Sequence, residues 1–398
     1  MHVKHLSLTD FRNYRTADVD LEPGVTVFVG PNGQGKTNLV ESLGYLATVG
    51  SHRTSADSAM IRAGADAAIV RALLRHAERE LLVEVQLNRG AANRAQVNRS
   101  AVRTRELPRY FASVLFAPED LALVRGEPST RRRFIDELLV QRSPRLAGVQ
   151  ADYARVVTQR NSLLKSARAQ RIRPEQLTTL DIWDERLVEL GSELIDRRAA
   201  LVAELSDPLR AAYRSVAGVD QHPQISQRLS VLGATVDDDD ADAAAAASAS
   251  AAAQGSGAPS ASGRAGDTAE LFHAALAGVR RKELERGLTL IGPHRDDLLF
   301  ELNGLPAKGY ASHGESWSFA LALKLASAQL LRAESTTGDP VLVLDDVFAE
   351  LDAQRRRALA GAIAGFEQVL ITAAVLEDVP EELGAHLVRI KAGEVVGQ

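Results

Sequence analysis

The segment from Gly30 to Thr37 constrains the fold more than any other part of this 398-residue sequence. It reads Gly-Pro-Asn-Gly-Gln-Gly-Lys-Thr and matches the phosphate-binding pattern Gly-x4-Gly-Lys-[Ser/Thr] at every position. The β-branched and aromatic run 25–29 before it predicts a buried strand. Apolar residues with helical spacing follow it over 39–47. Because of these flanks, a chance match by an ordinary glycine turn is the weaker interpretation.

Each residue type in this loop suits the binding of ATP with Mg²⁺. Glycine lacks a Cβ atom, so the backbone can curl and direct its N–H groups at phosphate oxygens, and the next helix adds partial positive charge. The Lys36 ammonium would reach the β- and γ-phosphates, and the Thr37 hydroxyl would bind the metal. The predicted nucleotide-binding residues of the loop are Gly30, Pro31, Asn32, Gly33, Gln34, Gly35, Lys36 and Thr37.

A pair of acidic residues near the other end of the chain predicts the second half of this site. The apolar run 341–344 leads into Asp345 and Asp346, as in a buried parallel strand that ends at a carboxylate cluster. We expect Asp345 to hold Mg²⁺ and Asp346 to orient or deprotonate the attacking water. The predicted catalytic residues are Asp346 and the phosphate-binding Lys36. The alternative is a strand that merely begins a surface loop.

The distance between the two halves predicts a divided head. Asp345 follows Lys36 by 309 positions, and a helical pattern occupies Arg131 to about Val219. We therefore predict an α/β, ABC-type P-loop ATPase head, with a mixed sheet, helices and an antiparallel β lobe, split by an α-helical arm domain. The expected boundaries are 1–120 and 285–398 for the head and 121–284 for the arm.

Two features describe the predicted arm. Pro144, Pro174 and Pro208 are expected to interrupt its helices, so that 144–173 is the longest, at ~45 Å. Residues 236–268 combine a run of aspartates with alanine, serine and glycine and cannot bury enough apolar surface to order themselves. We expect disorder there, with an alanine-rich helix over 241–253 as the alternative.

Hydrophobic periodicity predicts the other elements. The expected helices are 270–286 and 315–332, and a loop is expected at 9–14. The expected strands are 6–8, 19–22, 69–74, 81–87, 113–116, 288–291, 299–302 and 368–372.

Two short segments resemble the remaining parts of an ABC-type head. Glu350-Leu351-Asp352 is similar to a D-loop, and Thr372 stands where a switch residue would contact the γ-phosphate. The segment 312–315 resembles a weak ABC signature, so Ser312 and Gly314 are predicted to bind nucleotide. The same residues also fit an ordinary helix N-cap, with Glu315 three residues after Ser312, and both interpretations can hold together.

A local excess of positive charge predicts contact with DNA. Twelve basic and four acidic residues lie between Arg125 and Arg173, in a chain of net charge −5. We predict DNA binding through Arg131, Arg132 and Arg133; the alternatives are a solvated helix face or packing of the arm against the head. Aromatic residues are only 5% of the chain, which favours contact with the duplex backbone over base stacking.

The composition excludes several other classes of protein. The chain has no cysteine, which rules out disulfides, thiolate zinc sites and cysteine nucleophiles. No signal peptide is recognisable after Met1, and no apolar run approaches the ~20 residues of a membrane span. We therefore expect a cytoplasmic protein.

Six stretches spread over nearly the full length resemble the RecF family of bacterial recombination mediators. The resemblance implies ATP-dependent dimerisation, DNA binding, and work with the RecO and RecR proteins at single-strand gaps, in repair, replication restart and the SOS response. Glu315 and Trp317 depart from the glutamine and basic residue that many relatives carry in the signature, and Ala349 replaces the usual serine of the D-loop. The stretches are 8–14, 30–37, 116–121, 131–136, 292–297 and 344–352.

The main hypothesis is therefore an ATP-switched, DNA-binding recombination mediator with weak, DNA-stimulated ATP hydrolysis. The alternative is a structural DNA-maintenance ATPase similar to SMC or Rad50 proteins. It would need long heptad arms and, in the Rad50 case, a Cys-x-x-Cys hook, which a chain without cysteine lacks.

Overall fold

The computed structural model describes residues 1–171, 178–233, 265–335 and 338–396. Of the segment 236–268, for which we expect disorder, only 265–268 are described, and they begin helix α7 (Ala265–Arg286). The alternative helix over 241–253 and Pro174 lie outside the described residues. Within the described part of the chain, no helix is both long enough and apolar enough to cross a membrane.

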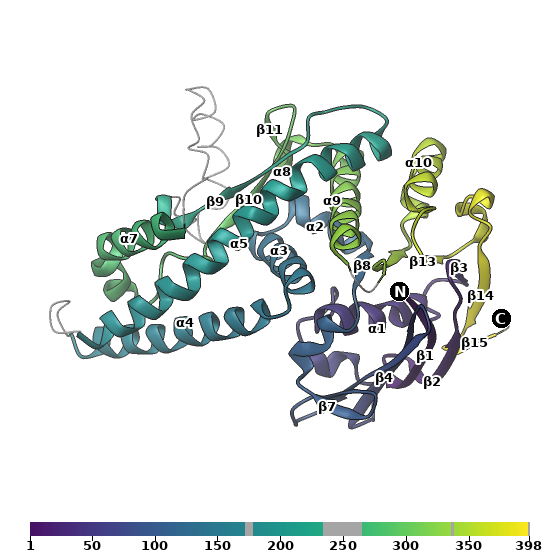
Figure 1. Cartoon of the computed structure of the whole chain (residues 1–398), viewed down its shortest axis with the longest axis horizontal. Coiled ribbons are helices and arrows are strands. Elements are labelled where there is room, and N and C mark those ends of the chain that lie inside the picture. Colours follow the sequence, from purple (N-terminus) through teal and green to yellow (C-terminus); the bar gives the residue numbers. More distant parts are fainter. Residues whose placement is uncertain (172–177, 234–264, 336–337, 397–398) are drawn as a thin grey trace.

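A six-stranded sheet lies at the centre of the head, in the order β15-β14-β3-β13-β12-β8 (Figure 1). β3 (Gly24–Val29) leads into the phosphate-binding loop and β12 (Val341–Asp345) ends at the acidic pair, so both predicted strands are confirmed. β13 (Gln368–Ala373) lies between them, and β8 (Ser113–Phe116) lies beyond β12. These four strands are parallel, so their carboxyl ends share one edge of the sheet.

Each face of this sheet packs into a separate hydrophobic core. Successive side chains of a strand point to opposite faces, so Leu342 and Leu344 enter one core and Val341 and Val343 enter the other. The latter core also contains α1 (Lys36–Thr48) and the antiparallel sheet β2-β1-β4-β5-β6-β7. This arrangement confirms the antiparallel β lobe that the sequence predicts around the phosphate-binding loop.

The hairpin of β1 (His2–Phe11) and β2 (Tyr14–Asp20) differs from the expected loop over 9–14. The two strands continue to a tight turn at Arg12 and Asn13. Phe11 pairs with Tyr14, and both side chains are fully buried. Burial of these two rings therefore extends the hairpin beyond the range that the polar residues of the segment suggest.

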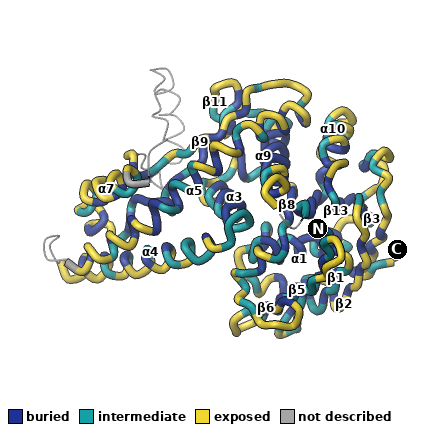
Figure 2. Tube along the Cα trace, in the orientation of Figure 1, coloured by how far each residue is buried: buried dark blue, intermediate teal, exposed yellow. Residues whose placement is uncertain are grey.

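Helices cover the opposite face of the central sheet. α3 (Pro128–Arg142), α9 (His313–Glu334), α10 (Ala353–Ile363) and the C-terminal half of α5 (Thr178–Ala217) share a core with that face. A small sheet, β11-β10-β9, contributes to the same core. Figure 2 shows this inner layer as buried, while the outer faces of α4 and α7 are largely exposed.

The arm projects from the head as three packed helices, α4 (Leu146–Ala169), the N-terminal half of α5 and α7 (Figure 1). α5 has 40 residues and a length of ~60 Å, whereas α4 has 24, so the prediction that 144–173 forms the longest arm helix is wrong. Pro208 also fails to interrupt α5. Leu205 and Leu209 beside it are fully buried in the head core, which holds the helix together despite the missing proline N–H.

The packing divides the chain differently from the predicted boundaries at 121 and 284. Several elements of the predicted arm pack in the head core instead. They are α2 (Leu121–Arg125), α3, residues 201–216 of α5 and β9 (Gln224–Arg228). β9 also pairs with β10 (Asp297–Leu302) of the head. α5 thus passes without interruption from the core of the arm into the core of the head.

The segment 288–291 is not a strand, contrary to the prediction. The Leu288 N–H donates to the Glu283 carbonyl at 3.2 Å, and the next two N–H groups bond to side chains instead of to a neighbouring strand. The Thr289 N–H donates to Asn161 Oδ1 at 2.7 Å, and the Leu290 N–H donates to Glu283 Oε1 at 2.8 Å. These side chains on α4 and α7 satisfy the backbone locally, so the apolar residues can be buried without a sheet.

The predicted segments 69–74, 81–87, 299–302, 270–286 and 315–332 each lie within an observed element of the predicted type. The elements not yet named complete the layers. These elements are β4 (Ala67–His76), β5 (Arg79–Asn88), β6 (Arg94–Val97), β7 (Ser100–Val102), β11 (Leu305–Pro306), β14 (His386–Lys391), β15 (Glu394–Val395), α8 (Ala307–Tyr310), and short 3-10 turns.

A buried arginine joins the three helices of the arm. The Arg160 side chain on α4 is fully buried. Its Nε donates to Asp184 Oδ1 of α5 at 2.7 Å, and its Nη2 donates to Glu283 Oε2 of α7 at 2.6 Å. Its Nη1 donates to the Thr289 hydroxyl at 2.9 Å. Removing the arginine would leave the fully buried Glu283 carboxylate without its cation and Asp184 with only Arg280, at 3.7 Å.

We therefore predict that Arg160→Leu lowers the free energy of unfolding by about 3–5 kcal/mol. Urea denaturation followed by circular dichroism measures the change. The matched control is Arg155→Leu on the same helix, where an exposed pair with Asp152 contributes at most about 1 kcal/mol. Equal losses in the two variants would contradict the role assigned to the buried cluster.

Candidate nucleotide-binding site

Four segments that are distant in the sequence meet at one edge of the central sheet. Asp345 on β12 pairs with Thr372 on β13, and Thr372 pairs with Phe28 on β3, just before the phosphate-binding loop. β8 ends in register with β12 and leads to Glu119. Because all four strands are parallel, the loop, both acidic residues and the residues after β8 are brought to the same place.

The loop itself is held in a compact conformation. Lys36 is the first residue of α1 and is 3% exposed, and its Nζ donates to the Gly30 carbonyl at 2.8 Å and the Pro31 carbonyl at 3.3 Å. Gly35 has a φ of 116°, and a Cβ atom there would lie 2.8 Å from the Tyr14 hydroxyl oxygen. The hairpin turn packs against a surface that only glycine can provide.

The Asp345 carboxylate lies at the centre of the site and is 2% exposed. The Thr37 hydroxyl donates to its Oδ1 at 3.1 Å and the Thr372 hydroxyl at 2.6 Å. Burial raises its pKa to about 6, with a further contribution from the nearby charge of Asp346, while the two hydroxyls oppose the rise. A buried carboxylate beside a threonine hydroxyl is a set of hard oxygen ligands, which fits Mg²⁺.

Asp346 and Thr372 share a constrained backbone arrangement. Asp346 adopts a left-handed conformation with a φ of 51°, and its N–H donates to the Thr372 hydroxyl oxygen at 2.9 Å. Thr372 is fully buried, so its hydroxyl positions the two aspartates. The Thr372 hydroxyl is thus committed to Asp345 and Asp346, and its direct contact with a phosphate stays a prediction.

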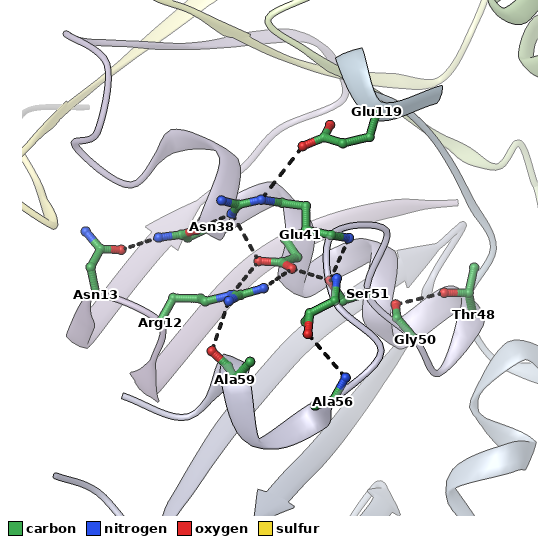
Figure 3. Close-up of polar contacts among 12 residues, drawn as sticks. Arg12, Asn13, Asn38, Glu41, Thr48, Gly50, Ser51, Ala56, Ala59 and Glu119 are labelled. Atoms are coloured by element: carbon green, nitrogen blue, oxygen red, sulfur yellow. Dashed lines mark hydrogen bonds and ion pairs between the residues drawn. The ribbon is translucent and has the colours of Figure 1, made fainter. Parts of the chain in front are cut away.

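Figure 3 shows a polar network beside α1 that the sequence analysis does not assign to the site. The Glu41 carboxylate of α1 is fully buried and accepts from Arg12 Nε at 2.8 Å and from the Ser51 hydroxyl. Asn13 accepts from Asn38 at 2.7 Å (Figure 3). It also donates to the Gln34 carbonyl of the loop at 3.2 Å. The hairpin turn is thus fixed to both the loop and the helix.

Sequence signals exist for three residues near the site, Arg12, Asn13 and Glu119, although no role follows from the signals alone. Arg12 and Asn13 occur in one of the stretches that resemble the RecF family, but pairing with α1 is visible only in three dimensions. Glu119 lies in the short turn Pro118–Asp120 that follows β8, and its charge contributes to the raised pKa of Asp345. An acidic residue after a short buried strand is a recognisable signal for this edge.

The signature residues lie elsewhere in the same chain. Ser312 caps α9, and its backbone N–H donates to Glu315 Oε2 at 2.7 Å while its hydroxyl accepts from the Glu315 N–H at 3.3 Å. The predicted N-cap is confirmed. This end of α9 lies beside α8, at a distance from α1 in Figure 1. The fold therefore brings Lys36, Thr37, Asp345 and Asp346 together but leaves Ser312 and Gly314 apart from them.

The three arginines predicted to contact DNA make internal contacts. Arg131 is 5% exposed and binds both carboxylate oxygens of Asp297, at 2.7 and 2.9 Å. Arg132 donates to the Asp296 carbonyl at 2.7 Å. Arg133 donates to the Ser51 carbonyl and pairs with Glu137, and its side chain is 44% exposed. The packing alternative accounts for Arg131, whose guanidinium is not presented at the surface.

The loop between β3 and α1, the acidic end of β12, and the inserted arm together define a P-loop ATPase head of the ABC and SMC class. A family model described as the RecF/RecN/SMC N terminal domain matches residues 2–393. The chain is also 68% identical over 396 residues to the DNA replication and repair protein RecF of Leifsonia xyli subsp. xyli, covering 100% of this chain and 99% of that protein. The chain therefore belongs to the RecF family of DNA replication and repair proteins.

Other relatives and solved structures agree with this placement. The DNA replication and repair protein RecF of Streptomyces avermitilis is 52% identical, with 99% of each chain covered. The structure of the recombination mediator protein RecF-ATP in the RecFOR pathway superposes with a TM-score of 0.83 at 26% identity, over 99% of this chain and 97% of that chain. An SMC head bound to the C-winged helix domain of ScpA gives a TM-score of 0.52 at 13% identity, over 100% of this chain and 97% of that chain, which supports the fold alone.

The buried charge at Asp345 leads to a prediction about stability. The pKa of Asp345 in the folded chain, about 6, lies above its ordinary value of 3.8, so the folded state binds this proton more tightly than the unfolded state does. Asp345 therefore destabilises the fold increasingly as pH rises from about 4 to about 6. Asp345→Asn keeps an oxygen acceptor for both threonines. Above pH 6 in the presence of a chelator, its free energy of unfolding should exceed that of the wild type by on the order of 3 kcal/mol.

The measurement is urea unfolding of both proteins in EDTA between pH 4 and pH 8, with the difference expected to close toward pH 4. The control is Asp352→Asn, because Asp352 caps α10 and its pKa is lowered by the Arg355 N–H. Asp352→Asn should be less stable than the wild type at neutral pH and equally stable in acid. Its effect at neutral pH is therefore opposite in sign to that of Asp345→Asn. A pH-independent difference at Asp345 would contradict its buried charge.

Proposed function

We propose that this chain is an ATP-dependent, DNA-binding recombination mediator that acts in DNA repair and replication restart, with ATP controlling its dimerisation. The observation that carries the proposal is the separation, within one chain, of a complete P-loop and acidic pair from the signature at the start of α9. The structural neighbour whose name includes RecF, ATP and the RecFOR pathway supports the same function. By the same reasoning, the chain works with RecO and RecR proteins at gapped DNA. We place this activity in the cytoplasm and in the SOS response.

Each residue of the site has a proposed role. Gly30, Pro31, Asn32, Gly33, Gln34 and Gly35 direct backbone N–H groups at the phosphates, and Lys36 binds the β- and γ-phosphate oxygens. Thr37 and Asp345 hold Mg²⁺, which when bound neutralises charge on the phosphates. Asp346, fixed by the Thr372 hydroxyl, orients or deprotonates the attacking water.

The separated signature is explained by a site composed from two chains. Ser312 is exposed at the N-terminus of a 22-residue helix, so its hydroxyl and the partial positive charge of the helix are available to a phosphate held by another copy. ADP lacks the γ-phosphate and would make fewer of these contacts. ATP thus binds the closed dimer better than the open chain and shifts the population toward it.

The contacts of Glu315 bear on the strength of this closure. Its carboxylate accepts from the Ser312 N–H and, at 2.6 Å, from the Gln221 amide, and these bonds lower its pKa. The carboxylate therefore remains charged but is occupied by donors of its own chain. We propose that closure is weak and that hydrolysis is slow and stimulated by DNA.

DNA contact is proposed for the exposed cations of the region from Arg125 to Arg173, with Arg133 as the accessible member of the arginine run. Lys165 and Arg171 on and after α4 are exposed and have no ion pair among the residues that the structure describes. Each can neutralise a phosphate of a duplex without sequence preference. Arg131 supports the DNA surface from inside, through its contact with Asp297.

Mixing two inactive variants tests the composite site. Lys36→Met removes the phosphate contact of one chain, and Ser312→Arg blocks the signature of the other, so each variant alone should lose ATP hydrolysis. A mixed dimer contains one intact P-loop that faces one intact signature. Steady-state ATPase assays with gapped DNA should therefore show recovery on mixing, of up to about a quarter of wild-type activity when subunits associate at random.

The control for this experiment is the doubly substituted chain, Lys36→Met with Ser312→Arg, mixed with either single variant. No such mixture contains an intact pair, so no activity should return. If the two single variants associate but hydrolyse no ATP together, the two-chain site is wrong. Normal ATP affinity in Lys36→Met would separately overturn the role of the loop.

Charge reversal separates DNA contact from packing in the arm. Lys165→Glu combined with Arg171→Glu should weaken duplex binding and reduce the slope of log affinity against log salt by about 2, with no change in thermal unfolding. Arg131→Glu should instead lower the unfolding midpoint, because it places a second carboxylate beside Asp297. Fluorescence anisotropy at several salt concentrations measures the slope, and an unchanged slope would move the DNA surface away from α4.

A further inference from the structure

An arginine from α10 packs directly on the glycine of the signature. A Cβ atom added at Gly314 would lie 2.9 Å from Arg355 Nη1, 3.5 Å from Nη2 and 3.6 Å from Cζ. The guanidinium therefore lies over the backbone of Gly314, where any larger residue would displace it. This contact joins the beginning of α9 to the beginning of α10, two segments that are separated by β12 in the chain.

The hydrogen-bonding groups of this arginine are largely unused within the part of its own chain that the structure describes. Among the described residues, its side chain has one ion pair, from Nε to Asp352 Oδ2 at the long distance of 3.7 Å, and is 29% exposed. The Asp352 carboxylate is itself occupied as the cap of α10, where it accepts from the backbone N–H groups of Gln354 and Arg355. Both Nη atoms are therefore free to bind an acceptor outside the chain.

The neighbouring arginines of α10 contrast with it. Arg356 donates to Asp378 Oδ1 at 2.8 Å and to the Leu351 carbonyl at 2.9 Å, so it is committed to the packing of the head. Arg357 is exposed and, among the described residues, donates to the Ala353 carbonyl of its own helix alone, at 3.3 Å. Only Arg355 of these three lies against the signature.

We propose that Arg355 acts in trans, as a cation that the signature presents to the γ-phosphate of a nucleotide bound by the partner's P-loop. The inference rests on the two-chain site proposed above. Arg355 cannot serve the P-loop of its own chain, because α10 and the start of α9 lie away from the start of α1 (Figure 1).

The chemistry of phosphoryl transfer explains what such a cation contributes. Negative charge on the transferred group is spread over its oxygens, and a guanidinium offers two parallel donors to them. The signature already carries the carboxylate of Glu315, which would repel a phosphate. The charge of Arg355 acts on Glu315, whose pKa it helps to lower, and so offsets that repulsion.

The test uses Arg355→Gln, Arg355→Lys and the control Arg357→Gln. Arg355→Gln should lower the rate of ATP hydrolysis by about 10- to 100-fold, with ATP affinity of the isolated chain and thermal unfolding unchanged. Arg355→Lys keeps the charge and should recover part of the rate. Arg357→Gln should hydrolyse ATP at the wild-type rate, and an equal loss in that variant would overturn a specific role for Arg355.

Mixing distinguishes action in trans from a role within the chain. Arg355→Gln mixed with Lys36→Met creates one site in which an intact P-loop faces an intact Arg355, so activity should return. No return, while Lys36→Met and Ser312→Arg do complement each other, would overturn the inference and leave the two-chain site in place. If neither pair recovers activity although the chains associate, the proposed function itself fails, and the inference fails with it.

Discussion

The hydrogen bonds that Thr37 and Thr372 donate to Asp345 hold the nucleotide-binding site together. They join the first helix of the chain to two strands that are more than 300 residues away in the sequence. The carboxylate that receives them is buried and would be unfavourable there without donors. The parallel pairing of β3, β13 and β12 makes this arrangement possible, because it places all three strand ends at one edge.

The arm depends on the same head through a single continuous helix. α5 contributes its first half to the core of the arm and its second half to the core that covers the central sheet. The base of the arm is fastened further by the bidentate bond of Arg131 to Asp297 and of Arg198 to Asp136. A movement of α9 in the head would therefore be transmitted to the arm through α5, which packs against it.

Much of the site could be predicted from the sequence, because its residues occur in local patterns. The loop 30–37 and the apolar run ending at Asp345 each need only a few consecutive residues to be recognised, and parallel sheet rules then bring them together. The fold class follows from the same two patterns and the helical insertion. The signature at Ser312 is readable as a helix cap, although its distance from the P-loop is a property of the fold alone.

The errors have a common physical cause, which is partners that are remote in the sequence. Arg131 looks like a surface cation in a basic run, but its Nε and Nη2 donate to Asp297, which follows Arg131 by more than 100 residues in the sequence. The segment 288–291 looks like a strand because it is apolar, but Asn161 and Glu283 satisfy its backbone. Pro208 looks like a helix end, but buried leucines on both sides keep the helix intact. Neither charge nor periodicity reveals such tertiary contacts.

The order of strands in the central sheet has a consequence for the synthesis of the protein. β3 carries the phosphate-binding loop, yet both of its neighbours, β13 and β14, lie beyond residue 367. At the usual pace of translation, both edges of this apolar strand wait on the order of 20 to 70 seconds for their partners. Until then the nascent chain carries an apolar strand with both edges unpaired, and such edges are templates for pairing with another chain.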